Sequence, residues 1–437
     1  MHKSNETFPL IQLALDFTES ERALKAAKEA ASGEGIEWIE AGTPLIKSEG
    51  LNCVRMLKKE FPGKKIIADM KIMDTGRFEA EMAFKAGADI VVVMGAASDS
   101  TIREAVEASG NYGGQIMVDL MEDFATAERA KEVEKLGAHY IGVHIPIDRQ
   151  MAGNAAFDSL KKIAKSVQVP VAIAGGLNSE NIVDAIKAGA SILIVGGAVT
   201  KSPDAAVSAG KLRQAMKTGK PVRTSLYKRA SLDNIGGIFE KVSSANLTDA
   251  LHRQGWIKEV FPVLTENFKL SGPAVTVRTY PGDWAKPVEA IDTAEENSVI
   301  VIDAGGVGPA VWGELATCSA ITRKLAGVVI YGGARDVEEI RRLKFPAFSK
   351  VICPEAGEPK GFGEINVPLR IGSQAVSPVD WILGDSDGVV VIPRDRIAET
   401  ANRAMDVLER ENRIRKEILD GGTLSRVANL LKWEKTR

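Results

Sequence analysis

Eight short apolar runs, each followed by a charged stretch with helical spacing, fill the first half of this 437-residue chain. The runs cover residues 10–16, 38–42, 65–71, 90–95, 115–120, 140–145, 171–175 and 192–197. Continuous runs rich in Val and Ile are typical of parallel strands that are covered on both faces. Eight strand–helix units predict an α/β fold, a (β/α)8 TIM barrel. A doubly wound open sheet is the alternative, ranked second because polar residues end many of the runs.

The regular alternation stops near residue 215, which places a barrel domain at 1–215 and a linker at 216–234. A separate C-terminal α/β domain is expected at 235–437, ending in a charged helical tail at 394–419. Its strand candidates are 260–265, 274–278, 298–303, 327–331, 351–353 and 388–392. The two halves share no recognisable repeat.

Charge and cysteine content narrow the functional class. Lys plus Arg (56) nearly equals Asp plus Glu (58), so no nucleic-acid partner is expected. The three cysteines form no CxxC pair, which favours neither a disulfide framework nor a zinc site. No apolar run approaches the ~20 residues that span a bilayer, and the first residues lack a signal-peptide pattern. We therefore expect a cytoplasmic protein without a membrane partner.

Polar side chains end several of the runs, where barrel enzymes carry their chemistry. Asp16 ends the first run, Glu40 the second, and Asp69 with Lys71 the third. Residues 69 and 71 share one face of a strand, so a carboxylate and an ammonium would face the barrel axis together. The pair would serve proton transfer or carbanion stabilisation. The alternative is a buried ion pair that only holds the strand.

Glu40 and Asp69 lie on adjacent strands, where two carboxylates repel each other unless a cation separates them. Oxygen ligands suit Mg²⁺ (or Mn²⁺), which would polarise a carbonyl and stabilise an enediolate. In the alternative, Glu40 pairs with Lys71 and no metal binds. His144 ends the sixth run and is a candidate acid or base, although a lone His is as often a core residue.

Two glycine pairs end the last two strands of the predicted barrel. Gly175 and Gly176 follow the seventh strand, and Gly196 and Gly197 follow the eighth. Glycines at both positions allow backbone N–H groups to approach a phosphate.

With these motifs, residues 9–215 resemble 3-hexulose-6-phosphate synthase, in the orotidine-monophosphate decarboxylase superfamily. The resemblance rests on strand-end motifs along the whole domain: Leu15-Asp16, Glu40-Ala41-Gly42, Asp69-Met70-Lys71-Ile72-Met73-Asp74, Val143-His144, Ala174-Gly175-Gly176 and Val195-Gly196-Gly197. It implies reversible aldol addition of formaldehyde to ribulose 5-phosphate.

The resemblance also implies a role for each site residue of the barrel. Glu40 and Asp69 would bind Mg²⁺, Lys71 and His144 would handle protons at the enediolate, and Asp16 would orient hydroxyl groups. Asp74 would reach a neighbouring subunit's site, so the barrel would act as a dimer.

The nearest competing interpretation is a decarboxylase of a 3-keto sugar-acid 6-phosphate, of the ketogulonate-6-phosphate type. Such enzymes usually carry Arg where this chain has Gly197, and a second Arg shortly after the His. Here Ile145, Pro146 and Ile147 follow His144, and the first Arg is Arg149. Both departures favour the synthase.

In the second domain, Arg335-Asp336 follows a glycine-rich strand end. An Arg can bind a substrate carboxylate while the Asp holds a metal. The alternative is a surface pair, with Asp336 placed favourably at a helix start.

Residues 235–410 resemble the family named for regulator of ribonuclease E activity A, which includes 4-hydroxy-4-methyl-2-oxoglutarate aldolases. The matching residues are 243–250, 272–274, 313–315, Arg335-Asp336 and Glu339. In the aldolase branch Arg335 would bind the substrate carboxylate, Asp336 would lie in the Mg²⁺ shell, and Glu314 would serve proton transfer. Other members are regulators that bind a ribonuclease. Relatives form trimeric rings, so a larger homo-oligomer of dimeric barrels and trimeric rings is expected.

Overall fold

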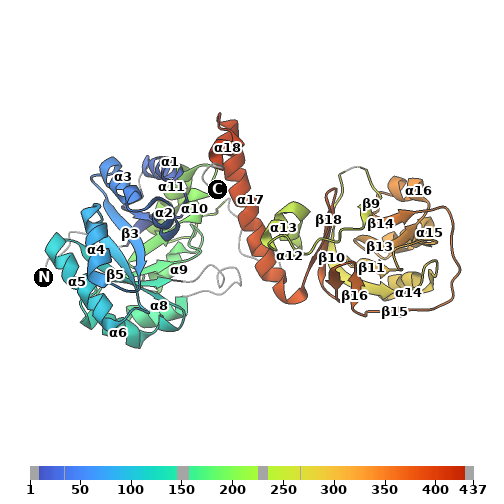
Figure 1. Ribbon diagram of the computed structural model, residues 1–437, viewed down its shortest axis with the longest axis horizontal. Coiled ribbons are helices and arrows are strands. Elements are labelled where there is room, and N and C mark those ends of the chain that lie inside the picture. The colour runs from blue at the N-terminus through green and yellow to red at the C-terminus, as the bar shows by residue number, and fades with distance from the viewer. Residues whose placement is uncertain (1–8, 34, 145–156, 225–234, 266, 429–437) are drawn as a thin grey trace, which may run out of the picture. The chain divides into compact units, whose positions relative to one another are not determined.

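The computed structural model describes residues 9–428 except 34, 145–156, 225–234 and 266 (Figure 1). Contacts divide the chain into two compact units. The first unit holds the barrel, and from Glu409 onward it also includes the end of the chain. The second unit runs to Leu408. This division differs from the expected one, which left the whole helical tail with the second domain.

The first unit is a closed barrel of eight parallel strands in sequential order, which confirms the predicted TIM barrel and excludes the open sheet. The strands are β1 (Leu10–Leu15), β2 (Trp38–Ala41), β3 (Lys65–Ile72), β4 (Ile90–Met94), β5 (Gln115–Met121), β6 (Tyr140–His144), β7 (Val171–Ala174) and β8 (Ile192–Val195). Strand β1 pairs with both β2 and β8, and these pairings close the barrel.

Helices surround the barrel, as the amphipathic spacing predicts (Figure 1). They are α1 (Ser20–Ala31), α2 (Thr43–Glu49), α3 (Asn52–Glu60), α4 (Gly76–Lys85), α5 (Asp99–Tyr112), α6 (Ala127–Lys135), α8 (Phe157–Ala164), α9 (Ile182–Lys187), α10 (Gly197–Thr200) and α11 (Ala205–Thr218). Several end at a glycine that turns the chain into the next strand. Gly87 has φ +100°, and Ala88 N bonds Ala83 O at 3.1 Å, which closes the helix end.

Two apolar layers hold the barrel together. The inner layer includes Leu10, Trp38, Ile67, Tyr140 and Ile192, with the Trp38 and Tyr140 rings in edge contact at 5.4 Å. The outer layer lies between the strands and the helices. Because both strand faces are buried, the strand sequences are mostly apolar, and most of their polar residues lie at the strand ends; Gln12, in the middle of β1, is an exception.

The second unit is a mixed sheet with helices, in the strand order β19-β18-β10-β11-β13-β14-β9. Its strands are β9 (Phe261–Pro262), β10 (Leu270–Arg278), β11 (Val299–Asp303), β12 (Ala310–Trp312), β13 (Gly327–Ala334), β14 (Ala347–Ile352), β15 (Glu364–Ile365), β16 (Leu369–Ile371), β17 (Gln374–Val376), β18 (Trp381–Asp385) and β19 (Gly388–Ile392). The sequence patterns missed β12 and β15 to β17, which have only two or three residues each, and also the five-residue β18, which lies between β19 and β10. They placed β14 several residues late.

The helices of the second unit are α12 (Ile235–Phe239), α13 (Ser244–Ala250), α14 (Ala285–Thr293), α15 (Glu314–Thr322) and α16 (Val337–Arg342). Helix α17 (Ile397–Leu419) begins in this unit, and its residues from Glu409 onward belong to the barrel unit, with α18 (Leu424–Val427) after it. No helix among the described residues is long and apolar enough to cross a membrane.

Candidate active site

Carboxylates from the first three barrel strands meet at the strand ends. Glu40 of β2 and Asp69 of β3 are buried, with 6% and 7% of their surface exposed. Thr43 Oγ1 donates to Asp69 Oδ2 at 2.7 Å, and Gln12 of β1 donates its side-chain amide to Glu40. Asp16 follows β1 at the rim. The sequence therefore predicted a real cluster, although neither Gln12 nor Thr43 was singled out.

Lys71 connects this cluster to the opposite strands. Its Nζ lies 3.2 Å from Asp69 Oδ2 and 2.9 Å from Asp119 Oδ2 of β5. The same Asp119 oxygen lies 3.2 Å from Nδ1 of His144, at the end of β6. Asp119 thus joins Lys71 to His144. Its position at a strand end was visible in the sequence, but nothing local indicated which side chains it would contact.

Burial and charge set the protonation of these groups. Burial, then the Asp69 and Asp16 carboxylates, hold the pKa of Glu40 well above its ordinary value. Loss of hydration around the carboxyl group and the nearby Asp69 carboxylate also raise the pKa of Asp16, although the residue as a whole is exposed at the rim. For Asp119, burial is outweighed by His144 and Lys71, which lower its pKa to about 2. Burial likewise opposes the charge on Lys71, but Asp119 and Asp69 raise its pKa above the ordinary value.

The donor set fits a hard divalent cation. Two buried oxygens in the cluster, Asp69 Oδ1 and Gln12 Oε1, have no hydrogen-bond partner among the described residues. Buried acceptors without partners require an explanation, and a bound ion supplies one. No three His, Cys, Asp or Glu side chains of the described ranges converge closely enough to hold an ion by themselves. Water and substrate oxygens would complete the shell, as Mg²⁺ sites in proteins usually require.

A glycine is required at position 42, because the Asp16 side chain lies directly against the backbone at the end of β2. A Cβ atom on Gly42 would lie 2.2 Å from Asp16 Oδ1, well inside contact distance. The glycine in the Glu40-Ala41-Gly42 motif therefore makes room for the neighbouring carboxylate.

The glycine pairs lie at the ends of β7 and β8, as predicted. Gly175 and Gly176 have φ of +114° and +68°, a region that L side chains rarely adopt. Gly196 precedes the four-residue α10, which starts at Gly197. A Cβ on Gly197 would lie 3.5 Å from Nζ of Lys201, so this lysine reaches back over the glycine turn. The sequence reading had not singled out Lys201.

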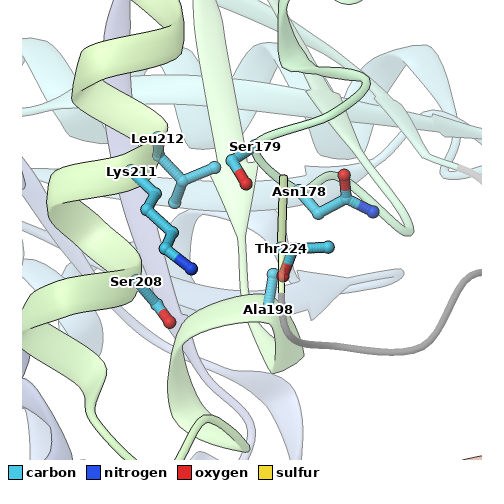
Figure 2. Close-up of a pocket in the computed structure, with 7 residues that line it drawn as sticks. All are labelled: Asn178, Ser179, Ala198, Ser208, Lys211, Leu212 and Thr224. Carbon is cyan, nitrogen blue, oxygen red and sulfur yellow. The ribbon is translucent and has the colours of Figure 1, made fainter. Parts of the chain in front are cut away.

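A small pocket lies between α11 and the segments that follow β7 and β8 (Figure 2). Asn178 and Ala198 line it together with Ser208 and Lys211 of α11 and Thr224. None of the described residues that line it is one that the sequence predicted for the site.

Asp74, which the sequence predicted for the site, lies apart from the cluster. Asp74 is exposed and its Oδ1 accepts only the backbone N–H of Thr75, at 2.7 Å, among the described contacts. Within one chain it therefore does not join Asp69 and Lys71. The segment after His144, including Pro146 and Arg149, lies outside the described residues.

The second unit brings its three predicted residues together at two helix starts. Asp336 Oδ2 accepts the backbone N–H of Glu314 at 3.1 Å and lies 3.5 Å from Nε of Arg335. Asp336 has φ +56°, an uncommon conformation for a non-glycine residue and one that is frequent at functional sites. A Cβ on Gly313 would lie 2.5 Å from Asp336 Oδ2. Glu339 points elsewhere and pairs with Arg342.

Comparison with known proteins assigns each half of the chain to a separate family model. Residues 9–212 match the model described as Orotidine 5'-phosphate decarboxylase / HUMPS family. Residues 244–391 match the model described as RraA-like, Aldolase/RraA. The segment from Glu409 onward lies outside both matches.

Two curated relatives and one solved structure match the first half. The 3-hexulose-6-phosphate synthase of Mycobacterium gastri is 41% identical over 206 residues, 47% of this chain and 99% of the relative. That of Bacillus subtilis is 39% identical over 210 residues, 48% of this chain and 99% of the relative. A crystal structure of a 3-hexulose-6-phosphate synthase is 41% identical and covers 47% of this chain and 99% of its own, with a TM-score of 0.45.

Proposed function

The chain belongs, through residues 9–212, to the orotidine 5'-phosphate decarboxylase / HUMPS family, and from that premise we propose that its barrel condenses formaldehyde with ribulose 5-phosphate to 3-hexulose 6-phosphate. The observation that carries the proposal is the Lys71–Asp119–His144 chain facing the Glu40 and Asp69 carboxylates. It combines a fixed positive charge, a base and a pair of carboxylates for a cation, which an aldol reaction through an enediolate requires.

Glu40 and Asp69 would hold Mg²⁺ or Mn²⁺ in this proposal. When bound, the ion polarises the ketone of the sugar phosphate and stabilises the enediolate oxygens. The raised pKa of Glu40 means that this carboxyl would release a proton as the cation binds, because a metal ligand must be ionised.

His144 is the proposed base. Asp119 contacts its Nδ1, which orients the ring and leaves Nε2 for the substrate. The base takes the proton from C1 of ribulose 5-phosphate, and C1 then forms the new bond to the carbon of formaldehyde. The formaldehyde oxygen takes up a proton to become the new hydroxyl group. The reverse sequence releases formaldehyde.

Lys71 has a different role from the base. Its raised pKa keeps the ammonium protonated, so it offsets negative charge on the enediolate and can return a proton, but it does not remove one at neutral pH. Asp16 at the rim would orient substrate hydroxyl groups. The glycine turns at Gly175-Gly176 and Gly196-Gly197 would bind the phosphate through backbone N–H groups.

Decarboxylation of a 3-keto sugar-acid 6-phosphate is the second candidate for the barrel. It would use the same enediolate chemistry after loss of carbon dioxide. Gly197 stands where such decarboxylases usually carry Arg, and this favours the aldol reaction. Product analysis with both substrates separates the two.

For the second unit we propose a lyase-like reaction on a 2-oxo acid, with Arg335 binding the carboxylate, Asp336 in a Mg²⁺ shell and Glu314 transferring a proton. The contact of Asp336 with the Glu314 backbone and with Arg335 supports this candidate. A regulator that binds a ribonuclease is the other candidate. The regulator would be favoured if the intact chain turned over none of the 2-oxo acids tested and if Asp336→Ala altered no activity of the chain.

The test of the barrel reaction is formaldehyde release from 3-hexulose 6-phosphate. We expect Mg²⁺-dependent release by the intact chain, loss of about 10³-fold in kcat/KM for Asp69→Ala, and no change for Asp99→Ala, an exposed carboxylate of the same barrel. Chelation should abolish activity, and Mg²⁺ or Mn²⁺ should restore it. Full activity of Asp69→Ala would refute the assignment.

A further inference from the structure

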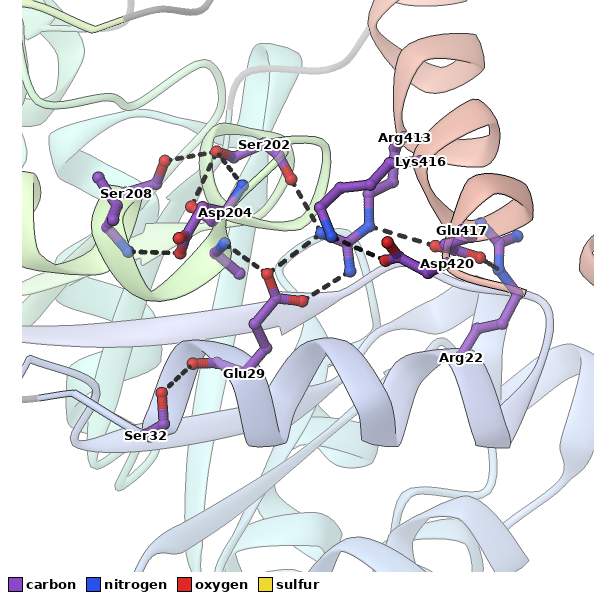
Figure 3. A network of polar contacts seen from close by, with 12 residues as sticks. Arg22, Glu29, Ser32, Ser202, Asp204, Ser208, Arg413, Lys416, Glu417 and Asp420 are labelled. Atoms are coloured by element: carbon purple, nitrogen blue, oxygen red, sulfur yellow. Dashed lines mark hydrogen bonds and ion pairs between the residues drawn. The ribbon is translucent and has the colours of Figure 1, made fainter. Parts of the chain in front are cut away.

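Among the described residues of the barrel unit, Arg413 is a deeply buried arginine that comes from the far end of the chain. Arg413 of α17 is 6% exposed. Its guanidinium donates to both carboxylate oxygens of Glu29 on α1, at 2.7 and 3.3 Å, and to the backbone O of Ser202 at 3.0 Å (Figure 3). Its Nε donates to Glu417, which also binds Arg22. A guanidinium is suited to such multiple contacts because its donors form a rigid fork.

Glu29 and Arg413 hold the same turn from two sides. Glu29 Oε1 also accepts the backbone N–H of Ala205, the first residue of α11, at 2.9 Å. Arg413 holds the turn at Ser202 O. Between these two points, the Ser202 hydroxyl donates to Asp204 O at 2.9 Å and accepts from Ser208 at 2.7 Å (Figure 3). The turn from Ser202 to Ala205 is therefore fixed by side chains of α1 and α17.

This turn is directly continuous with the glycine turn after β8. Lys201 N bonds Gly197 O at 3.0 Å, and Ser202 N bonds Val199 O at 3.2 Å. The Lys201 side chain lies against Gly197. Ser202, which Arg413 holds, is thus connected to the glycine turn by backbone hydrogen bonds within a few residues. A shift of Ser202 would therefore move Gly197 and the Lys201 ammonium together.

The contacts of Arg413 with Glu29 and Ser202 come from a segment outside the part of the barrel that matches the family model. Residues 409–428 lie outside the family matches at 9–212 and 244–391, yet they belong to the barrel unit and bring Arg413 to it. A substitution of Arg413 would leave the Glu29 carboxylate without its guanidinium partner and the Ser202 carbonyl without its charged donor, which disfavours the present position of the turn.

We propose that Arg413, acting through Glu29 and Ser202, is a positioning residue for the phosphate group of the barrel's substrate, with Lys201 as the side chain that it places at the glycine turn. The inference rests on the proposed function for the identity of the substrate. Arg413 does not touch the reacting atoms, so its loss should weaken phosphate binding and leave the chemical step unchanged.

The experiment compares the full chain with Arg413→Ala, Glu29→Gln and Lys201→Ala. Arg415→Ala is the matched control, because Arg415 lies on the same helix, is exposed and contacts Asn412 beside it. Titration calorimetry gives the Kd of ribulose 5-phosphate and of inorganic phosphate, and steady-state assays on the same preparations give kcat and both KM values.

We expect Arg413→Ala to raise the Kd and KM of ribulose 5-phosphate about tenfold, with kcat and the formaldehyde KM unchanged, since small misplacements of binding groups cost about that much or more. Glu29→Gln should act in the same direction. The Arg413→Ala/Lys201→Ala double variant should lose less than the product of the single effects, because both residues act through one turn.

Three results would overturn the positioning role. One is a lower Tm of Arg413→Ala with an unchanged Kd for ribulose 5-phosphate. Another is fully multiplicative effects of Arg413→Ala and Lys201→Ala. If Arg413→Ala does not fold, an unchanged Kd in Glu29→Gln is the third. Failure of the proposed reaction is separate: the wild-type chain would bind ribulose 5-phosphate without forming hexulose phosphate, and the Kd comparison would still decide the role of Arg413.

Discussion

At the scale of single residues, the barrel site is organised around Asp119. It is 6% exposed and contacts Lys71 and His144 through the same oxygen. An ionised carboxylate in this position pairs with the half-buried Lys71 ammonium and orients the imidazole ring. Because the Asp119 carboxylate is itself buried, its charge depends on these partners, which ties the protonation of the site to the stability of the barrel.

The lowered pKa of Asp119 makes a prediction about acid stability. Since the folded pKa (about 2) lies below the ordinary value, this group stabilises the fold above about pH 4, and the contribution is lost as the pH falls toward 2. The contribution amounts to about 2 kcal/mol in the free energy of unfolding. At pH 6 the free energy of unfolding from urea denaturation should be larger for wild type than for Asp119→Asn. This difference in free energy should become smaller as the pH falls toward 2. A gap that stays constant with pH would contradict the assignment.

At the scale of elements, the turns after the strands decide where the site residues point. Lys71 and Thr75 have φ of +47° and +48°, so the backbone leaves β3 in an uncommon conformation before α4 begins. Such conformations persist only when the surroundings hold them, and at Lys71 the ion pairs with Asp69 and Asp119 hold the side chain. At the end of β2, Gly42 gives the Asp16 carboxylate its space.

Gly42→Ala tests this close approach. The added methyl group would meet Asp16 Oδ1 at 2.2 Å, so the carboxylate must move away from its present position. We expect a loss of about tenfold to a hundredfold in kcat/KM for formaldehyde release, with the barrel still folded by circular dichroism. Gly63→Ala is the matched control, because a Cβ there meets nothing within 4 Å. Equal activity of both variants would show that Asp16 does not act in the site.

At the scale of the whole molecule, the barrel exposes three apolar side chains that lie close to Asp74 in the sequence. Met73 is 52% exposed, Phe78 66% and Met82 41%. Phe78 and Met82 lie one turn apart on α4 and share a face. Asp74 takes no part in the site of its own chain, and apolar side chains gathered on a surface mark an interaction site. The dimer that the resemblance implies would therefore use this face and bring Asp74 to the partner's site.

Phe78→Glu is expected to dissociate a dimer of barrels into monomers, because each subunit would place one negative charge in the apolar contact. Light scattering should show the decrease in mass, and kcat/KM should fall about as far as in Asp74→Ala. Leu419→Glu, at another exposed apolar position (79%) of the barrel unit, should change neither property. An unchanged mass for Phe78→Glu would exclude this face as the contact.

The amino-acid sequence determined the parts of this protein that depend on local spacing. Continuous apolar runs specify strands buried on both faces, and glycines after helices specify the turns into them, so eight β/α units followed directly. Because alternate residues of a strand share a face, the sequence predicted that Asp69 lies beside Lys71, and Asp69 Oδ2 is 3.2 Å from Lys71 Nζ. Short edge strands such as β16 and β17 carry too few residues to show a pattern.

Only the tertiary structure decided which distant groups meet. Lys71 and Asp119 are far apart in the chain and become neighbours because the closed barrel brings all its strand ends to one rim. The docking of Arg413 against Glu29 joins the two ends of the chain, and the sequence contains no local pattern that pairs them. Partner choice between buried charges depends on burial and distance in the folded state, and these quantities do not exist in a linear sequence.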